Sequence, residues 1–346
     1  MRLSPQNRFT RWPKILHGLG QDQLHWCTLL NVALIGYGRW GKIYEKTLNR
    51  LEEYNLSAVV SRKSEYWTAK KPGVHFVSSF EDLLSMDVDA IIIATPPHTH
   101  PDYIRWAIRM KMACLVEKPV CLSSKECLSL HEEIQKAEIP LLVGYLQLFS
   151  PRYQQLKNIL EESGEPVKLL ISEGMGLGPF RSETPALWDW LPHDVSMCLD
   201  IFGTAEEPSV ESLTVSAPSS DRPGPEMVYA RLQYEDGRTA IINAGGLYPA
   251  RQRKLSVFTD NSVFHLSEIH DPSLTVTDFK LQKLGTYGST WYPSGITLKT
   301  ESQQLPLDSM LGYFAGALRN HDSRYMGLGF SIEVSRLIER IIEQAR

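Results

Sequence analysis

The sequence lacks the cysteine patterns of a disulfide framework or of a zinc site. It has five cysteines, an odd number, with no CxxC pair and no cluster of His and Cys at zinc spacing. We therefore expect reduced thiols in an intracellular protein and no metal site. The cysteines are Cys27, Cys114, Cys121, Cys127 and Cys198.

Long apolar runs and an excess of positive charge are also absent. No stretch approaches the roughly 20 continuous apolar residues that cross a bilayer, so we expect a cytoplasmic protein without a membrane partner. The formal net charge is -4 and the Lys and Arg residues are scattered, which argues against nucleic acid as a partner. With 346 residues, of which 42% are hydrophobic and 22% charged, the chain is typical of a soluble protein with two domains.

Residues 1–30 form a basic N-terminal extension. This segment contains Arg2, Arg8, Arg11 and Lys14 but lacks the apolar core of about 7 to 15 residues that a secretory signal requires. Its apolar side chains could form a face that docks on the protein. The alternative is a loosely held tail, and both interpretations stay open.

Residues 31–150 show short apolar runs that alternate with helical segments. This alternation predicts crossover units and a doubly wound parallel sheet covered on both faces. The expected strands are NVALIG, LSAVVS, VHFV, VDAIIIAT, ACLVEKP and IPLLVGY, and the expected helices are Arg39 to Glu53, Ser79 to Ser85, Pro97 to Met110 and Ser123 to Ala137.

Residues 151–346 have a different character and predict a second, α+β domain. Extended runs separated by turn residues indicate a large, mostly antiparallel open sheet. The runs are PVKLLISEG, SVESLTVSA, EMVYARLQYE, RTAIINAGGLY and RKLSVFTDNSVFHLS, with helices expected near Pro151 to Glu161, Leu307 to Asn320 and Gly329 to Gln344. The fold class is therefore α/β, with the parallel sheet first.

The segment NVALIGYGRWGKIYEKTLNRL places a GxGxxG pattern between the first strand and the first helix. Gly36 permits the tight turn, Gly38 lets the backbone approach a pyrophosphate, and Gly41 allows the helix to pack on the strand. Arg39 and Trp40 open the helix, whose N-terminal N–H groups favour phosphate. A chance glycine turn is the alternative, and the position after the first strand of a β/α series argues against it.

The end of the second predicted strand bears on the choice of cofactor. It reads VVSRKS, so Ser61, Arg62 and Lys63 offer a hydroxyl and two cations where an NAD site usually has a carboxylate. We predict that NADP(H) is preferred and that NAD(H) is possible. The alternative is a solvated turn with ordinary surface cations.

Three later segments, with the glycine turn, resemble the Gfo/Idh/MocA oxidoreductases. These are ATPPHTH at 94–100, CLVEKPV at 114–120 and LWDWLPHDVSMCLDIFG at 187–203. The resemblance implies a Rossmann domain, then an α/β domain whose open sheet often joins subunits, here as a homodimer or homotetramer. It also implies hydride transfer between nicotinamide C4 and a sugar-like carbinol, with Lys118, Asp189 and His193 as the matching catalytic residues.

Physical chemistry supports those roles. Alcohol oxidation needs a base, and His193 has an ordinary pKa near working pH. Asp189 precedes it by four residues, near the start of a helix that Pro192 is suited to open, and can orient the imidazole or hold a substrate hydroxyl. Lys118 follows the fifth strand, where ligands of parallel sheets bind, and can hydrogen-bond the reacting oxygen. Taken singly, each residue also has a plain structural interpretation.

The loop ATPPHTH is expected to form the wall against the nicotinamide half of the cofactor. We assign Thr95, Pro96, Pro97 and His100 to this wall, and Glu117 to the organisation of the neighbouring loop. His98 stands two residues before His100 but has no carboxylate or cysteine partner, so a metal site is not expected. Whether the Lys118–Pro119 bond is cis stays open.

Substrate contacts are predicted from the resemblance to the branch that works on nucleotide-linked sugars. Tyr145 stands where a histidine commonly follows the glycine and could bond a sugar hydroxyl. Arg181 could bind a phosphate or carboxylate, and Trp188 or Trp190 could stack on a sugar. The alternatives are an ion pair with a nearby acid for Arg181 and packing between the domains for the tryptophans. The cations Arg251, Arg253 and Lys254 look like a solvated strand edge.

The function that these observations favour is an NAD(P)-dependent oxidoreductase acting on a sugar, polyol or nucleotide sugar. One alternative is a biosynthetic carbonyl or imine reductase that uses Lys118 as proton donor. The other is a catalytically silent dinucleotide-binding partner protein, against which the lysine, aspartate and histidine argue.

Overall fold

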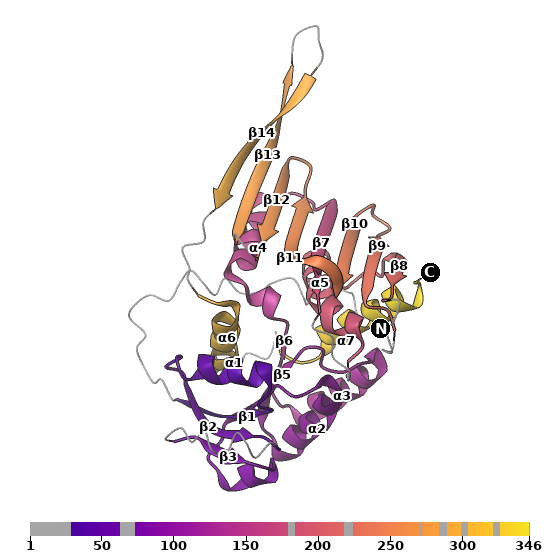
Figure 1. Cartoon of the computed structure of the whole chain (residues 1–346). Helices are drawn as coiled ribbons and strands as arrows, with labels where there is room; N and C mark the ends of the chain where they lie inside the picture. Colours follow the sequence, from indigo (N-terminus) through magenta and orange to yellow (C-terminus); the bar gives the residue numbers. More distant parts are fainter. Residues whose placement is uncertain are drawn as a thin grey trace, which may run out of the picture.

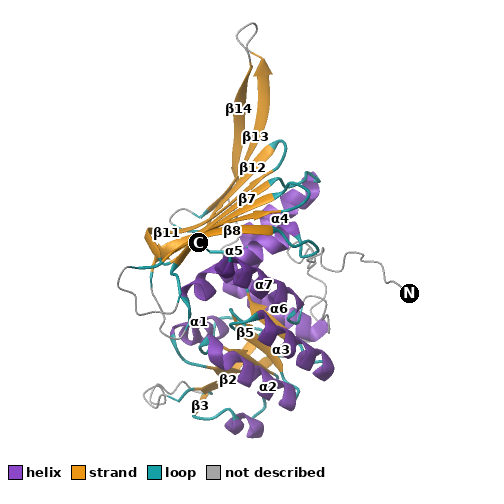
Figure 2. Ribbon diagram, turned by 90° about the vertical axis from the view of Figure 1, so that its right-hand side faces the viewer, coloured by secondary structure: helices purple, strands orange, loops and turns teal. Residues whose placement is uncertain are grey.

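The computed structural model describes residues 29–62, 73–178, 184–217, 224–269, 272–283, 289–298, 304–320 and 326–345 (Figure 1). Within these ranges the chain builds two sheets that lie one beyond the other, with most of the helices between and beside them (Figure 2). The predicted N-terminal extension, apart from its last two residues, lies outside the described residues, as does Cys27. The other four cysteines are buried free thiols.

The first sheet has six parallel strands in the order β3-β2-β1-β4-β5-β6, which confirms the predicted doubly wound sheet. Its central strands are largely apolar because helices cover both faces, and the four residues of β4 are all fully buried. The strands are β1 (Leu30–Ile35), β2 (Tyr54–Val60), β3 (His75–Val77), β4 (Ala90–Ile93), β5 (Ala113–Glu117) and β6 (Leu141–Gly144).

Helices follow the strands at the predicted places, with differences at their ends. The first helix stops at Leu48 rather than Glu53, and the chain enters β2 at Tyr54. Ser123 caps the third α-helix, because its Oγ accepts a hydrogen bond from the Glu126 N–H at 3.2 Å. The elements are α1 (Arg39–Leu48), η2 (Glu81–Ser85), η3 (Pro97–Thr99), α2 (His100–Met110), α3 (Ser124–Ala137) and η4 (Leu146–Phe149).

The second sheet has eight strands in the order β14-β13-β12-β11-β7-β10-β9-β8, all antiparallel except the β7–β10 pair. The predicted antiparallel sheet is confirmed. Two strands at one edge were not predicted, and they form a long hairpin that projects beyond the rest of the sheet (Figure 1). The strands are β7 (Leu169–Leu177), β8 (Ser209–Val215), β9 (Met227–Gln233), β10 (Thr239–Gly245), β11 (Leu247–Phe258), β12 (Ser262–Ser267), β13 (Ser273–Lys283) and β14 (Ser289–Leu298).

Two helices, α4 (Pro151–Ser163) and α5 (Ala186–Phe202), pack on one face of this sheet. The prediction that Pro192 opens a helix is wrong, because α5 begins six residues earlier at Ala186 and continues through the proline. Proline removes one helical hydrogen bond. The apolar neighbours Leu191 and Val195 are fully buried, and their packing keeps the helix continuous at this point.

The last two helices, α6 (Pro306–Asn320) and α7 (Gly329–Glu343), return toward the parallel sheet (Figure 1). The Tyr54 hydroxyl at the start of β2 donates to the Leu311 carbonyl in α6 at 2.6 Å. Glu339 in α7 accepts a hydrogen bond from the Ser124 N–H at the start of α3 at 2.8 Å. The division at residues 150 and 151 stays a prediction, and the last helices belong structurally to both halves.

No helix within the described ranges is long and apolar enough to cross a membrane.

His100 lies between the loop after β4 and the loop after β5. It is fully buried, with Nδ1 2.9 Å from the Pro119 carbonyl oxygen and Nε2 2.8 Å from the Thr95 carbonyl oxygen. Burial lowers the pKa of His100 from 6.5 to about 4, although contacts to the backbone of Thr95 and Pro119 oppose the shift. A neutral imidazole has one N–H, so it donates to one of these two carbonyl oxygens and packs against the other, between the loop after β4 and the loop after β5.

We predict that His100 makes stability fall on acidification. An unfolded chain protonates this histidine below about pH 6.5, whereas the folded chain keeps it neutral to about pH 4, so stability is lost as the pH falls across that window. Between about pH 6.5 and about pH 5 the loss should be roughly 2 kcal/mol smaller in His100→Gln than in the wild type, by urea unfolding. The exposed His75→Gln variant is the control, and equal losses in all three proteins would contradict the assignment.

Candidate active site

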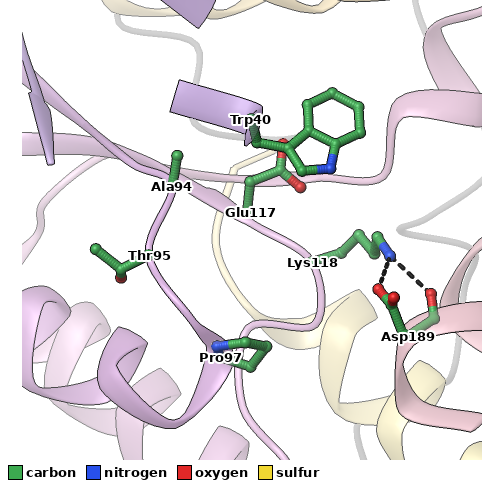
Figure 3. Close-up of a pocket in the computed structure, with 7 residues that line it drawn as sticks. All are labelled: Trp40, Ala94, Thr95, Pro97, Glu117, Lys118 and Asp189. Carbon is green, nitrogen blue, oxygen red and sulfur yellow. Dashed lines mark hydrogen bonds and ion pairs between the residues drawn. The ribbon is translucent and has the colours of Figure 1, made fainter. Parts of the chain in front are cut away.

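A pocket opens at the carboxyl ends of the parallel strands, where the two halves of the molecule meet. It is lined by residues of α1, of the loops after β4 and β5, and of the first turn of α5 (Figure 3). Ligands of open α/β sheets bind at this edge because loops diverge there. The lining residues are Trp40, Ala94, Thr95, Pro97, Glu117, Lys118 and Asp189.

The glycine turn next to this pocket leaves the N-terminus of α1 open. Gly36 has φ +96°, and a Cβ there would lie 2.8 Å from the Ala94 carbonyl oxygen. A Cβ at Gly41 would overlap the Gly36 carbonyl oxygen, whereas one at Gly38 would meet nothing within 4 Å. No side chain caps the N-terminus of α1. Open space and uncapped N–H groups fit a pyrophosphate, as the pattern predicts.

Of the residues predicted to hold the cofactor, four line the pocket: Trp40, Thr95, Pro97 and Glu117. Arg39, Pro96 and Arg62 are exposed, and Ser61 is buried at the end of β2. His100 does not line the pocket. Because both its ring nitrogens face backbone carbonyls, it positions the loops rather than contacting a cofactor.

Lys118 and Asp189 form an ion pair across the pocket. Lys118 Nζ lies 3.0 Å from Asp189 Oδ1 and donates to the Asp189 carbonyl oxygen at 2.7 Å (Figure 3). The lysine side chain is only 7% exposed and the aspartate 20%, so the contact is largely shielded from solvent. Strand β5 supplies the cation and helix α5 supplies the carboxylate, which come from opposite halves of the chain.

His193 follows Asp189 by one turn of α5, so both project from the same side of the helix. Its Nδ1 is covered and has no hydrogen-bond partner. Burial lowers the pKa of His193 well below its ordinary value, and the positive charges of Lys118 and Arg253 lower it further. The structure therefore pairs Lys118 with Asp189 and places His193 where the charge of Lys118 acts on it, although His193 is not among the residues that line the pocket. The imidazole is neutral at physiological pH.

Glu117 accepts a hydrogen bond from a residue that was not predicted from the sequence. The hydroxyl of Tyr44, on α1, donates to Glu117 Oε1 at 2.8 Å, and burial followed by the carboxylate charge raises the pKa of Tyr44. Tyr44 stands three residues after Gly41, on the inward face of the helix, and this spacing could have identified it. The Lys118–Pro119 bond, which the sequence left open, is cis.

Two predicted substrate contacts lie elsewhere. Tyr145 is 5% exposed, packs edge-on against Phe330 at 5.8 Å between ring centroids, and has Ser331 of α7 beside its hydroxyl. Trp188 is 6% exposed and belongs to the core under α5. Both side chains pack rather than line the pocket. Arg181 lies outside the described residues.

A second ion pair lies beside His193. Arg253 Nη1 donates to Asp194 Oδ2 at 2.9 Å, and Arg253 is 11% exposed. The prediction that Arg253 belongs to a solvated strand edge is wrong, because its side chain turns toward α5. A carboxylate in an otherwise apolar stretch of helix was the available signal for a buried partner.

The described residues hold no group of three or more His, Cys, Asp or Glu side chains that could bind a metal ion.

Comparison with known proteins matches residues 30–145 to the Gfo/Idh/MocA model, an oxidoreductase family with an NAD-binding Rossmann fold. Inositol 2-dehydrogenase of Corynebacterium glutamicum (strain R) is 30% identical over 160 residues, which are 44% of this chain and 47% of that enzyme. The chain spans about half to two-thirds of the length of the first curated relatives that it matches.

Two solved structures match over most of their length. A presumed oxidoreductase of Magnetospirillum magnetotacticum MS-1 is 28% identical, with 90% of this chain and 99% of that chain covered and a TM-score of 0.76. UDP-N-acetylglucosamine 3-dehydrogenase GnnA of Acidithiobacillus ferrooxidans is 20% identical, covers 91% of this chain and 97% of its own, and has the same TM-score of 0.76. At 20% identity, the similarity to GnnA shows a shared fold alone.

The glycine turn and the strand order agree with this match, and residues 30–145 form an NAD(P)-binding Rossmann domain similar to that of the Gfo/Idh/MocA oxidoreductases.

Proposed function

We propose that this chain is an NADP(H)-dependent oxidoreductase that transfers a hydride between nicotinamide C4 and a carbinol or carbonyl of a sugar, polyol or nucleotide sugar. The observation that carries the proposal is the Lys118–Asp189 ion pair in the pocket at the carboxyl ends of the strands, with a neutral His193 one turn further along α5. A base, a hydrogen-bond donor and an orienting carboxylate are the groups that alcohol oxidation requires.

In the oxidation direction His193 accepts the proton of the substrate hydroxyl, because its imidazole is neutral and one turn from Asp189. Lys118 donates a hydrogen bond to the same oxygen and stabilises negative charge that develops on it. Asp189 fixes the ammonium in place through its carboxylate and its carbonyl. A bound nicotinamide supplies the hydride acceptor. In the reverse direction Lys118 and His193 return the proton to the carbonyl oxygen.

For the cofactor, the proposal of NADP rests on the end of β2. Ser61 and Arg62 stand there, Arg62 is exposed, and the VVSRKS sequence has no carboxylate at this point that would repel a 2′-phosphate. An arginine can bind that phosphate bidentately. Lys63 lies outside the described residues, and NAD(H) remains a possible second cofactor.

The substrate class is proposed from the site and its relatives. One relative is an inositol 2-dehydrogenase and one structural neighbour a UDP-N-acetylglucosamine 3-dehydrogenase, and both names describe oxidation of a ring hydroxyl. Lys118 and Asp189 can hydrogen-bond such a hydroxyl, and neither residue requires a charged group on the substrate. This leaves cyclic polyols and nucleotide sugars as the two substrates to compare.

We also propose that copies of the chain associate through the second sheet. On the sheet face opposite α4 and α5, large apolar side chains are exposed at the β8 edge, including Leu213 at 56%, Val215 at 43% and Tyr229 at 40%. Apolar surface of this kind is typical of an interface.

The first prediction concerns activity. A panel of inositols, free sugars and UDP-sugars, read at about 340 nm with each cofactor, should show reduction of NADP with at least one ring alcohol. A carbonyl or imine reductase would oxidise NADPH with panel ketones or imines but leave ring alcohols untouched. Cofactor binding without turnover on any substrate would favour a silent partner protein and contradict the proposal.

The second prediction concerns Lys118. In Lys118→Met, kcat should fall by about 10² to 10⁴-fold, because the donor to the reacting oxygen is lost, while the Kd for NADP changes by less than about twofold. Stopped-flow kinetics and fluorescence titration measure the two quantities. The exposed Lys136→Met is the matched control, and full activity in Lys118→Met would refute the mechanism.

The third prediction concerns cofactor choice. Arg62→Ala should raise the KM for NADP by about tenfold or more, the effect of losing a charged hydrogen bond, and leave the KM for NAD nearly unchanged. Arg109→Ala removes an exposed arginine at the end of α2 and serves as the control. A wild type that prefers NAD would contradict this part of the proposal.

A further inference from the structure

Asp194 follows His193 directly in α5 and is completely buried. Its Oδ1 accepts a hydrogen bond from Ser172 Oγ on β7 at 2.6 Å, and its Oδ2 accepts one from Arg253 Nη1 on β11 at 2.9 Å. Both oxygens of a carboxylate in the middle of a helix are thus held by two neighbouring strands of the second sheet.

The backbone leaves space for this ion pair. Arg253 and Gly174 are partners in the β7–β11 pairing. A Cβ at Gly174 would overlap both Asp194 Oδ2 and Arg253 Nη1. The glycine therefore lets the helix and the guanidinium come close at a point where another residue would separate them.

A gain in folding stability does not by itself explain why a buried ion pair is present here. Removing two charges from water costs several kcal/mol per ion before their attraction is counted, and apolar residues of similar volume often stabilise a protein as well. Here the pair adjoins the residue proposed as base. Its place beside His193 points to a role in the site.

The charged groups brought to His193 in the described structure come from three elements. Lys118 approaches from the end of β5, Arg253 from β11, and Asp189 and Asp194 belong to the same helix. Burial is the largest cause of the lowered pKa of His193, and the positive charges of Lys118 and Arg253 lower this pKa further.

The strand neighbours of the pair do not share this environment. Glu173 and Lys254 alternate with Gly174 and Arg253 along β7 and β11, so their side chains project from the opposite face of the sheet. Their charges act instead on His265, whose pKa Lys254 lowers and Glu173 raises.

We propose that Arg253 is a positioning residue that, through its buried ion pair with Asp194, holds the middle of α5 on the sheet and so fixes His193 beside Lys118. Its charge also favours the neutral imidazole, which is the form that accepts a proton. This inference rests on the proposed function, in which His193 is the base.

The test compares Arg253→Met, which removes the charge, with Arg253→Lys, which keeps it. Arg253→Met should lower kcat for oxidation by about tenfold or more, because a displaced base transfers the proton less efficiently. The Kd for NADP should change by less than about twofold, because Arg253 does not contact the glycine turn. The acidic limb of kcat/KM should move to higher pH by about half a unit or more, because His193 binds a proton more readily without the cation. Arg253→Lys should restore the position of the limb.

Lys157→Met is the matched control. Lys157 Nζ lies 3.1 Å from Asp200 Oδ2, and this pair also ties α5 to its surroundings, seven residues beyond His193. Removing it should lower the unfolding free energy without moving the acidic limb. If Arg253→Met behaves in the same way, Arg253 is merely structural and the proposal is overturned.

A measurement without turnover separates this inference from the proposed function. In protein labelled at histidine Cε1, His193→Asn identifies the resonance of His193, and Arg253→Met should raise its titration midpoint by about half a unit or more relative to wild type. Arg253→Gln takes its place if the methionine variant does not fold. If the titration midpoint shifts but the protein is inactive on every substrate, only the proposed function is contradicted. If the midpoint does not shift, the proposed role of Arg253 is contradicted.

Discussion

The ion pair between Lys118 and Asp189 is the contact on which the rest of the site depends. The lysine stands at the end of a strand buried on both faces, and the aspartate in a helix packed on a different sheet. A largely buried ammonium is costly unless a carboxylate meets it. The two halves must therefore meet in one arrangement, and that arrangement also places Trp40, which follows the glycine turn, in the same pocket as the ion pair.

Burial then sets the protonation of the groups around this pair. His193 and His100 stay neutral because a charged ring would be poorly solvated, and Tyr44 keeps its proton beside Glu117. These groups serve different ends. His193 is the proposed base, His100 lies between two loops, and Tyr44 donates a hydrogen bond to a carboxylate, although the same physical effect governs all three.

Much of the first half was predictable from the sequence. Its strands are buried on both faces and so appear as apolar runs, and Gly36 and Gly41 stand at places where a Cβ would collide. The motifs predicted that Lys118, Asp189 and His193 share a site, and the structure pairs Lys118 with Asp189. The strands Ser273–Lys283 and Ser289–Leu298 were missed because polar residues interrupt them and leave no apolar run.

The errors arose where a side chain's direction depends on distant packing. Tyr145 follows a strand that ends at the site, yet its ring turns toward α7. Arg253 resembles a surface cation in its local sequence, because its partner Asp194 is 59 residues away. Local pattern identifies the elements that contain an apolar run. It does not reveal which of two faces a residue at the end of an element will join.

The return of α6 and α7 to the first sheet has a consequence for dissecting the molecule. Tyr54 and Arg50 of the nucleotide-binding half bond to Leu311 and Asp308 near the far end of the chain. A fragment cut after the sixth parallel strand would expose the surface that these helices cover. Any attempt to graft this half onto another scaffold must carry the last forty or so residues with it, as a second piece joined in space rather than in sequence.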